Sequence, residues 1–181
     1  MEQLDVLTEL ARSGRLGPVA NGAAWDTVTA TLGEPWEVTI GNRRSWPRLF
    51  AYGDLELSVC RCRRVILICL QTWRAVIELP AGLADGDTVP GGPTYAEVIG
   101  ALDRAGCAWQ PHEPLTFGNQ CSIRATSSGV VFVFEIPDGE EPVLNVVGPP
   151  PHRHDCPATD TTHATRPAGV KPVERAPCPG R

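Results

Sequence analysis

Six consecutive apolar residues, Val65 to Leu70, constrain the fold of this chain more than any other stretch. A strand that is apolar on both faces needs cover on both, so we place this one at the centre of a sheet. Before it, Leu55, Leu57 and Val59 alternate with polar or small residues, which is the pattern of a half-buried strand. The stretch from Leu49 to Thr72 therefore predicts an antiparallel meander around which the rest of the chain is arranged.

Three further segments have the periodicity and end signals of helices. Apolar residues recur at helical spacing over 2–12 and 24–32, and a glycine suited to a helix end follows each. A third helix is predicted over 94–105, where Thr94 and Glu97 have the spacing of a capping box. Residues 81–93, rich in glycine, aspartate and proline, are predicted to be a linker. The additional strands that we expect are 36–40, 76–79, 107–110, 122–125, 130–136 and 143–147.

The same order of elements occurs twice. A shift of 70 residues aligns the apolar positions of the second and third helices, pairing Trp25, Val28 and Leu32 with Tyr95, Val98 and Leu102. A shift of 75 aligns two half-buried strands, pairing Leu55, Leu57 and Val59 with Val130, Phe132 and Phe134. Two amphipathic helices can share apolar positions by chance, but here the flanking residues and the element order agree as well. We therefore predict a tandem repeat.

The predicted fold class is α+β, with two similar helix-plus-antiparallel-sheet halves. Residues 1–80 form the first half, and residues 81–147 form the second half, which we expect to pack on the first. From Gly148 onward prolines recur, aromatic residues are absent and no apolar period survives. Residues 148–181 are therefore predicted to be a disordered, proline-rich C-terminal tail.

Composition and charge exclude several classes of function. The formal net charge of −5 lacks the basic footprint of a nucleic-acid-binding protein. The first residues show no signal-peptide pattern, and an apolar run of six residues is far too short to span a membrane. Seven cysteines at irregular spacing are typical of reduced thiols rather than of a disulfide framework. We expect a cytoplasmic protein that binds neither nucleic acid nor a membrane.

Three short motifs within residues 15–136 carry a resemblance to known proteins. They are Arg15-Leu16-Gly17-Pro18-Val19, Trp25-x-x-Val28-x-x-x-Leu32-Gly33-x-Pro35 and Tyr52-Gly53-Asp54-Leu55-Glu56-Leu57. These motifs resemble small uncharacterised bacterial proteins, common in actinobacteria and cyanobacteria, some of which resemble immunity proteins of polymorphic-toxin systems. The Val-x-x-x-Leu-Gly-x-Pro segment is similar to the helix–turn of BamE-like modules and of β-lactamase-inhibitor-protein-like modules, and the latter are tandem duplications. The resemblance implies a duplicated α+β module with a protein partner. The signal of the BamE-like lipoproteins is missing, so a role in outer-membrane assembly is not implied.

Candidate catalytic groups are scattered along the sequence. Asp54 and Glu56 lie on one side of a predicted strand, where paired carboxylates can act as acid and base, but Asp54 is better suited to closing the preceding turn. Cys60 and Cys62 stand beside arginines that favour thiolates, yet they lack the paired spacing of zinc sites. His112, which lies in a loop between prolines, has no nucleophile linked to it by a recognisable motif. We therefore expect no catalytic residue and no enzymatic activity.

A group of possible metal ligands occurs in the predicted tail. His152, His154 and Cys156 suit zinc or nickel, and His163 or Cys178 offers a fourth ligand. A proline-rich segment has no nearby core to orient these ligands, whereas metal ligands are normally held in place by the surrounding fold. We therefore expect neither a bound metal nor a cofactor.

Tryptophan and arginine, residue types that are enriched at protein interfaces, flank the predicted strands. The candidate partner-binding residues are Trp36, Trp46, Arg48, Trp73 and Arg74. The alternative role for these tryptophans is to close the ends of the sheet. Together the features favour a non-enzymatic protein-binding module, most concretely an immunity protein that occludes the site of a basic toxin domain. The alternatives are a structural or regulatory interaction protein with another partner and, less favoured, a hydrolase or a metal-binding protein.

Overall fold

Two four-stranded antiparallel meanders build the main sheet. The computed structural model of the chain describes residues 3–39, 46–83 and 88–156. The first meander comprises β3 (Glu37–Thr39), β4 (Arg48–Tyr52), β5 (Leu55–Val59) and β6 (Val65–Gln71). The second comprises β9 (Trp109–Pro111), β10 (Gln120–Ala125), β11 (Val131–Glu135) and β12 (Val143–Gly148).

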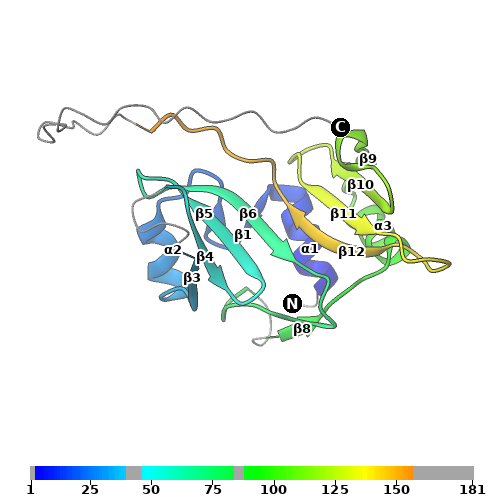
Figure 1. Ribbon diagram of the computed structural model, residues 1–181, viewed down its shortest axis with the longest axis horizontal. Helices are drawn as coiled ribbons and strands as arrows, with labels where there is room; N and C mark the ends of the chain where they lie inside the picture. The colour runs from blue at the N-terminus through cyan, green and yellow to red at the C-terminus, as the bar shows by residue number, and fades with distance from the viewer. Residues whose placement is uncertain (1–2, 40–45, 84–87, 157–181) are drawn as a thin grey trace, which may run out of the picture.

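The two meanders join through their last strands, so the order across the sheet is β3-β4-β5-β6-β12-β11-β10-β9 (Figure 1). In this antiparallel joint Gln71 lies opposite Val146, and Leu70 lies opposite Val147. β6 is therefore a central strand, as its unbroken apolar sequence predicts. The joint makes one continuous sheet, and with it one core, out of both halves of the chain.

In the described part of the chain, three α-helices cover one side of this sheet (Figure 1). They are α1 (Gln3–Ser13), α2 (Trp25–Leu32) and α3 (Tyr95–Arg104), which confirms the predicted helices and the α+β class. α1 packs against α3, and the ring of Trp25 stacks on Phe50 of β4 with the ring centroids 4.4 Å apart. The largest fully buried side chains of the core include Tyr52, Phe132 and Phe134. Burial of one such side chain contributes about 1.5–3 kcal/mol to folding.

The start of α3 has the capping box that the sequence predicts. Thr94 Oγ1 accepts a hydrogen bond from the backbone N–H of Glu97 at 3.3 Å, and Glu97 Oε2 accepts one from the backbone N–H of Thr94 at 2.8 Å. These two bonds satisfy amides that the first turn of a helix leaves free. The third helix therefore begins where its local sequence specifies.

Two short hairpins lie outside the main sheet. β1 (Arg15–Leu16) pairs with β2 (Val19–Ala20), and β7 (Val76–Glu78) pairs with β8 (Thr88–Pro90). β8 falls inside the predicted linker 81–93, so that prediction is wrong for these three residues. The second hairpin forms because Ile77 and Val89 lie opposite each other and are both buried. A three-residue strand offers too little alternation to be recognised in a Gly- and Pro-rich segment.

The chain stays close to the sheet after β12. Residues 149–156, which the sequence assigned to the disordered tail, continue beside β6, where the backbone N–H of His152 donates to the carbonyl of Ile66 at 2.7 Å. The predicted boundary of the tail therefore lies too early in the chain. The remaining part of the predicted tail, 157–181, lies outside the described residues.

Candidate functional site

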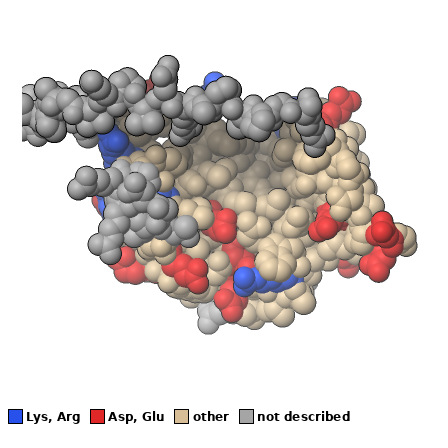
Figure 2. Space-filling view, in the orientation of Figure 1, with Lys and Arg blue, Asp and Glu red and all other residues tan. Residues whose placement is uncertain are grey.

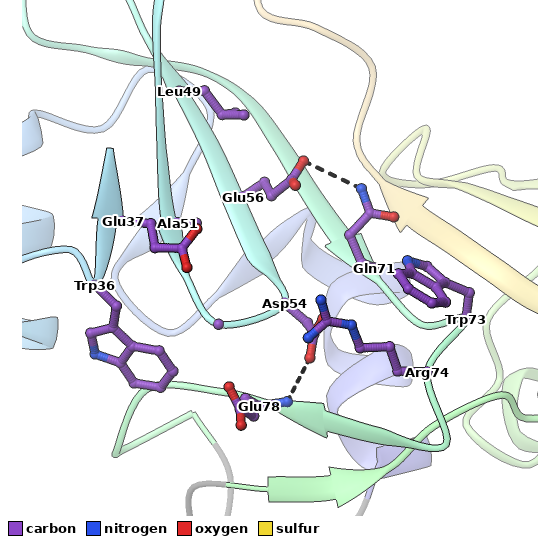
Figure 3. Close-up of a pocket in the computed structure, with 11 residues that line it drawn as sticks. Trp36, Glu37, Leu49, Ala51, Asp54, Glu56, Gln71, Trp73, Arg74 and Glu78 are labelled. Atoms are coloured by element: carbon purple, nitrogen blue, oxygen red, sulfur yellow. Dashed lines mark hydrogen bonds and ion pairs between the residues drawn. The ribbon is translucent and has the colours of Figure 1, made fainter. Parts of the chain in front are cut away.

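A polar hollow of about 310 Å³ lies where the β4–β5 turn approaches the segment between β6 and β7 (Figure 3). We call it the acidic pocket. Its walls come from the start of β3, the outward side chains of β4 and β5, the end of β6 and the end of β7. Segments that are remote in the sequence therefore contribute to one site.

The floor of the acidic pocket is the tight turn between β4 and β5. Gly53 in this turn has a φ of 61°, in the left-handed region that strains other residues. A Cβ atom at Gly53 would lie 2.6 Å from the carbonyl oxygen of Glu78 and 2.7 Å from Cζ3 of Trp36. Glycine is required here because it allows Trp36 and β7 to approach the turn closely.

Asp54 fixes β7 against this turn. Its side chain is buried, Oδ2 accepts a hydrogen bond from the backbone N–H of Glu78 at 2.8 Å, and Oδ1 lies 3.5 Å from Nε of Arg74. The sequence predicted that Asp54 would close its own turn. Instead, its carboxylate reaches across to the neighbouring strand, because the turn carries β7 directly beside it. We therefore interpret Asp54 as a residue that positions the pocket walls.

Two exposed tryptophans stand on either side of the pocket (Figure 3). Trp36 is 50% exposed and Trp73 is 58% exposed. The guanidinium of Arg74 lies 5.1 Å from the centre of the Trp73 ring, a cation–π contact that orients both side chains. Such large and half-exposed rings are available to a binding partner.

Negative charge dominates the space between the tryptophans. Glu37, Glu56 and Glu78 line the pocket together with the buried aspartate, against the single guanidinium of Arg74 among the described lining residues. Glu56 Oε2 accepts a hydrogen bond from Gln71 Nε2 at 3.3 Å. The carboxylates of Glu37 and Glu78 make no hydrogen bond or ion pair within the described part of the chain. Figure 2 shows several red acidic groups on the lower part of this face, around one small blue basic area.

The structure brings together three of the five predicted partner-binding residues. Trp36, Trp73 and Arg74 line the acidic pocket. Arg48 begins β4, at the end of the strand away from the pocket floor, and its guanidinium lies 4.5 Å from the centre of the Trp46 ring. Trp46 is partly buried and packs against the core. The sequence identified the cationic and aromatic residues of the pocket. It indicated Asp54 and Glu56 only as a possible acid–base pair, and it did not identify Glu37 and Glu78.

A second hollow, of about 270 Å³, opens on the same face of the sheet. We call it the apolar hollow, because its lining includes Leu67, Cys69, Val133 and Val146. Cys69 lies directly opposite Glu56 in the β5–β6 ladder, so both hollows share one face. Burial, and to a smaller extent the charge of Glu56, raise the pKa of the Cys69 thiol to about 11. This thiol therefore stays protonated near neutral pH.

Four possible metal ligands meet at the opposite end of β5 from the pocket floor. One ligand atom from each of Cys60, Cys62, His154 and Cys156 lies within 4.8 Å of the others. The sequence pattern alone does not connect the two cysteines of the β5–β6 turn with the His–Cys pair of the tail. His163 and Cys178, the other candidate fourth ligands in the sequence, lie outside the described residues.

The thiols of this cluster influence one another. Hydrogen bonding with Cys156 raises the pKa of Cys62 to about 11, whereas hydrogen bonds from the backbone and thiol of Cys62 lower the pKa of Cys156. The sequence suggested that neighbouring arginines favour the thiolates. For Cys62 that direction is wrong, because Arg63 pairs with Asp26 at 2.6 Å and Arg64 donates to a main-chain carbonyl. The nearby thiols therefore have the larger effect on Cys62.

His112 lies beside a serine without forming a catalytic pair. Ser122 Oγ donates to the main-chain carbonyl of His112 at 2.6 Å, and Thr116 Oγ1 donates to the same carbonyl at 3.1 Å. These bonds hold the 3₁₀ helix η1 (Glu113–Leu115) against β10. Among the described residues, no hydrogen bond joins the imidazole of His112 to a serine or a cysteine.

The comparisons with known proteins identify no family for this chain. No family model matches it, and neither does any curated protein or solved structure. None of the helices in the described parts of the chain combines the length and apolar character needed to cross a membrane. The function is therefore inferred from the acidic pocket and from the apolar hollow beside it.

Proposed function

We propose that the protein is a non-enzymatic, cytoplasmic binding module whose acidic pocket receives a positively charged segment of a protein partner. One observation carries the proposal: the carboxylates of Glu37 and Glu78, which form no ion pair within the described part of the chain, lie between two half-exposed tryptophans at one end of the sheet. A site of this composition recognises charge and shape, and it requires no chemical step.

An arginine or lysine side chain suits the acidic pocket best. Glu37 and Glu78 offer carboxylates that have no other described partner. The ring faces of Trp36 and Trp73 attract cations through their π electrons, and they lose exposed area when a partner covers them. Large aromatic residues of this kind commonly dominate binding free energies. The negative field of the pocket also accelerates encounters with a basic partner.

A protein partner is favoured over a small cation because two hollows open on one face. The apolar hollow follows the acidic pocket across the same side of the sheet, from β6 to β11. Apolar surface beside a charged site is the usual anatomy of a protein interface. A partner that covers both hollows would bury tryptophan and aliphatic side chains in addition to forming ion pairs.

We infer a tandem repeat from matching contacts at the two helix starts. The first residue of α2 and the first residue of α3 each donate a backbone hydrogen bond to a residue just before the last strand of the corresponding meander. Trp25 N–H donates to the carbonyl of Arg63, before β6, and Tyr95 N–H donates to the carbonyl of Pro142, before β12, both at 2.8 Å. The residue before each of these helices also forms an isolated antiparallel β-bridge at the start of the same strand. Ala24 pairs with Arg64 next to β6, and Thr94 pairs with Val143 of β12. The matching contacts support a duplicated module, in agreement with the resemblance to β-lactamase-inhibitor-protein-like proteins.

An immunity protein is the most concrete version of this function. A rigid sheet face with tryptophan anchors can occlude the site of a toxin domain sterically, and its negative charge suits a basic toxin such as a nuclease. A structural or regulatory interaction protein would use the same pocket with a different basic partner. The charge preference of the pocket is common to both versions, so it is tested separately.

Selection from a displayed library of random peptides tests the charge preference. We expect selected peptides to be rich in arginine and lysine, and we expect their binding to weaken in salt and in Glu37→Gln/Glu78→Gln. Glu135→Gln/Glu140→Gln is the matched control, because these carboxylates are exposed but lie outside the pocket. Equal loss of binding in both double variants, or selection of neutral peptides, would contradict the proposal.

Co-expression tests the immunity version. Where a secreted repeat protein is encoded beside this gene, its C-terminal domain is co-expressed as the toxin. We expect the wild-type protein to protect cells, Trp36→Ala/Trp73→Ala to fail, and Phe117→Ala, which alters an exposed ring outside the pocket, to protect as well as wild type. Unprotected cells with the wild-type protein would reject the immunity version and would leave the structural or regulatory version.

A further inference from the structure

The turn between β5 and β6 presents two cysteines in a fixed conformation. Cys60 N donates to the carbonyl of Arg64, and Arg63 N donates to the carbonyl of Cys60, both at 2.9 Å. Arg63 has a φ of 56°, which closes the turn tightly. Cys60 is buried and Cys62 is half-buried. The turn therefore holds the Cys60 thiol in the buried core and the Cys62 thiol on a hydrogen-bonded turn beside it.

The chain after β12 brings the other two groups to this turn. The prolines at 149–151 have no backbone N–H, so they end the strand ladder. The chain is nevertheless held beside β6, because Asn21 Nδ2 donates to the carbonyl of Pro150 at 2.8 Å and the N–H of His152 donates to Ile66 at 2.7 Å. Two residues further on, the chain reaches the β5–β6 turn.

The imidazole of His154 carries a nitrogen that has no hydrogen-bond partner in the described part of the chain. Its Nε2 atom is buried and makes no hydrogen bond with the described residues. Buried polar atoms are almost always satisfied by a donor, by water or by an ion. The ring of the neighbouring His152 stacks on the ring of His154, with the ring centroids 6.3 Å apart, but His152 does not belong to the cluster of four possible ligands. The three cysteines of the cluster are free thiols, so their sulfur atoms are available as metal ligands.

We propose that Cys60, Cys62, His154 and Cys156 together bind one Zn²⁺ ion. Three thiolates and one imidazole are a typical donor set for a structural zinc site. With Zn–S bonds of about 2.3 Å, tetrahedral coordination places sulfurs about 3.8 Å apart, so ligand atoms now within 4.8 Å need to close by only about 1 Å. The proposal replaces the sequence-based expectation that the chain holds no metal.

Four protein ligands fill a tetrahedral site and leave no position for a substrate. The ion therefore acts as a cross-link between the β5–β6 turn and the segment that follows β12. Each thiol loses its proton when the metal binds, so the three thiolates and the ion leave one net negative charge at the site. The cross-link lies at the opposite end of β5 from the acidic pocket, and it does not depend on the function of the pocket.

Metal analysis of the full-length protein, purified without chelator or affinity metal, tests the site. We expect one zinc per chain. Replacement of zinc by Co²⁺ is expected to produce the intense visible bands and the near-ultraviolet charge-transfer band of tetrahedral cobalt–thiolate coordination. His154→Asn and Cys156→Ser are expected to lose the stoichiometric metal and the bands. Both changes lie in the segment after β12, so the sheet is expected to remain folded by circular dichroism.

Matched controls lie close to the site. His152→Asn changes the stacked neighbour of His154, and Cys69→Ser changes a half-buried thiol of β6 outside the cluster. Both are expected to retain one zinc and the cobalt spectrum. A metal-free wild-type protein would overturn the proposal, as would zinc retained in both ligand variants or a native Cys62–Cys156 disulfide.

Trypsin gives a second and independent readout. The Arg153–His154 bond lies between His152, whose N–H is bonded to β6, and the proposed ligands His154 and Cys156, and Arg153 is exposed. We expect this bond to resist cleavage in the zinc form and to be cleaved at least tenfold faster after chelation. Cleavage at the same rate with and without zinc would show that the ion does not fasten this segment, and it would reject the proposed cross-link.

Discussion

Replacing Asp54 with alanine removes the carboxylate that fastens β7 to the β4–β5 turn. The side chain of Asp54 is only 4% exposed, and its Oδ2 accepts the backbone N–H of Glu78 at 2.8 Å. A hydrogen bond to a charged group contributes about 1.5–3 kcal/mol, and its loss leaves a partly buried donor without a partner. We therefore expect the free energy of unfolding to fall by about 2–3 kcal/mol in Asp54→Ala.

Two further variants separate the hydrogen bond from the ion pair. Asp54→Asn retains an acceptor oxygen for Glu78, so we expect a loss of about 1 kcal/mol. Arg74 is 53% exposed and lies 3.5 Å from the carboxylate, so solvent screens the pair. We expect Arg74→Gln to reduce the free energy of unfolding by less than about 1 kcal/mol.

Urea denaturation at neutral pH, followed by far-ultraviolet circular dichroism, measures these differences. The dependence of the unfolding free energy on urea is expected to stay unchanged, because the variants expose the same surface on unfolding. If Asp54→Ala lies within about 0.5 kcal/mol of wild type, the buried hydrogen bond does not stabilise the turn. A loss in Arg74→Gln as large as in Asp54→Ala would refute the ranking of the two interactions.

Three other predictions concern the core and the ends of the elements. Burial, and to a smaller extent the charge of Glu34, raise the pKa of Tyr52 from its ordinary value of about 10 to about 12. The stability that the neutral phenol contributes is therefore complete below pH ~10 and is lost as the pH rises toward 12. Over this range we expect denaturation to show a steeper fall in stability for wild type than for Tyr52→Phe. Phe132 is fully buried, so we expect Phe132→Ala to lower the free energy of unfolding, measured in urea, by about 3–5 kcal/mol. The ring of Phe117 is 63% exposed, so we expect the free energy of unfolding of Phe117→Ala to stay within about 0.5 kcal/mol of wild type. Thr94→Ala removes the capping hydroxyl of α3 and is expected to lower the thermal midpoint, at a cost of about 1 kcal/mol.

The elements that the sequence predicted best are those with complete local patterns. The apolar run of β6 requires cover on both faces, and this requirement alone indicated a central strand. The capping box at Thr94 was recognisable because both of its hydrogen bonds form within one turn of helix. β8 has three residues and depends on pairing with β7, so no local pattern indicated it.

The two sites depend on contacts between remote segments. Trp36 and Trp73 face one pocket only because β3 and the β6–β7 segment reach the same end of the sheet. The Cys–His cluster requires β12 to pair with β6 and the chain to continue along it. Each half of the cluster offers only two or three ligands, fewer than the four of a structural zinc site. The two pairs have the same spacing, Cys-x-Cys and His-x-Cys, and this match was the sequence signal that could have predicted a shared site.

The two outermost strands restrict how another chain can join the sheet. In the described part of the chain β3 and β9 have three residues each, and β9 ends at Pro111, which has no N–H to donate. A short edge strand that ends in proline is a common protection against edge-to-edge association and aggregation. At the β9 edge a partner therefore finds little free backbone with which to extend the sheet by β-strand addition. It is directed instead to the side chains of the open face.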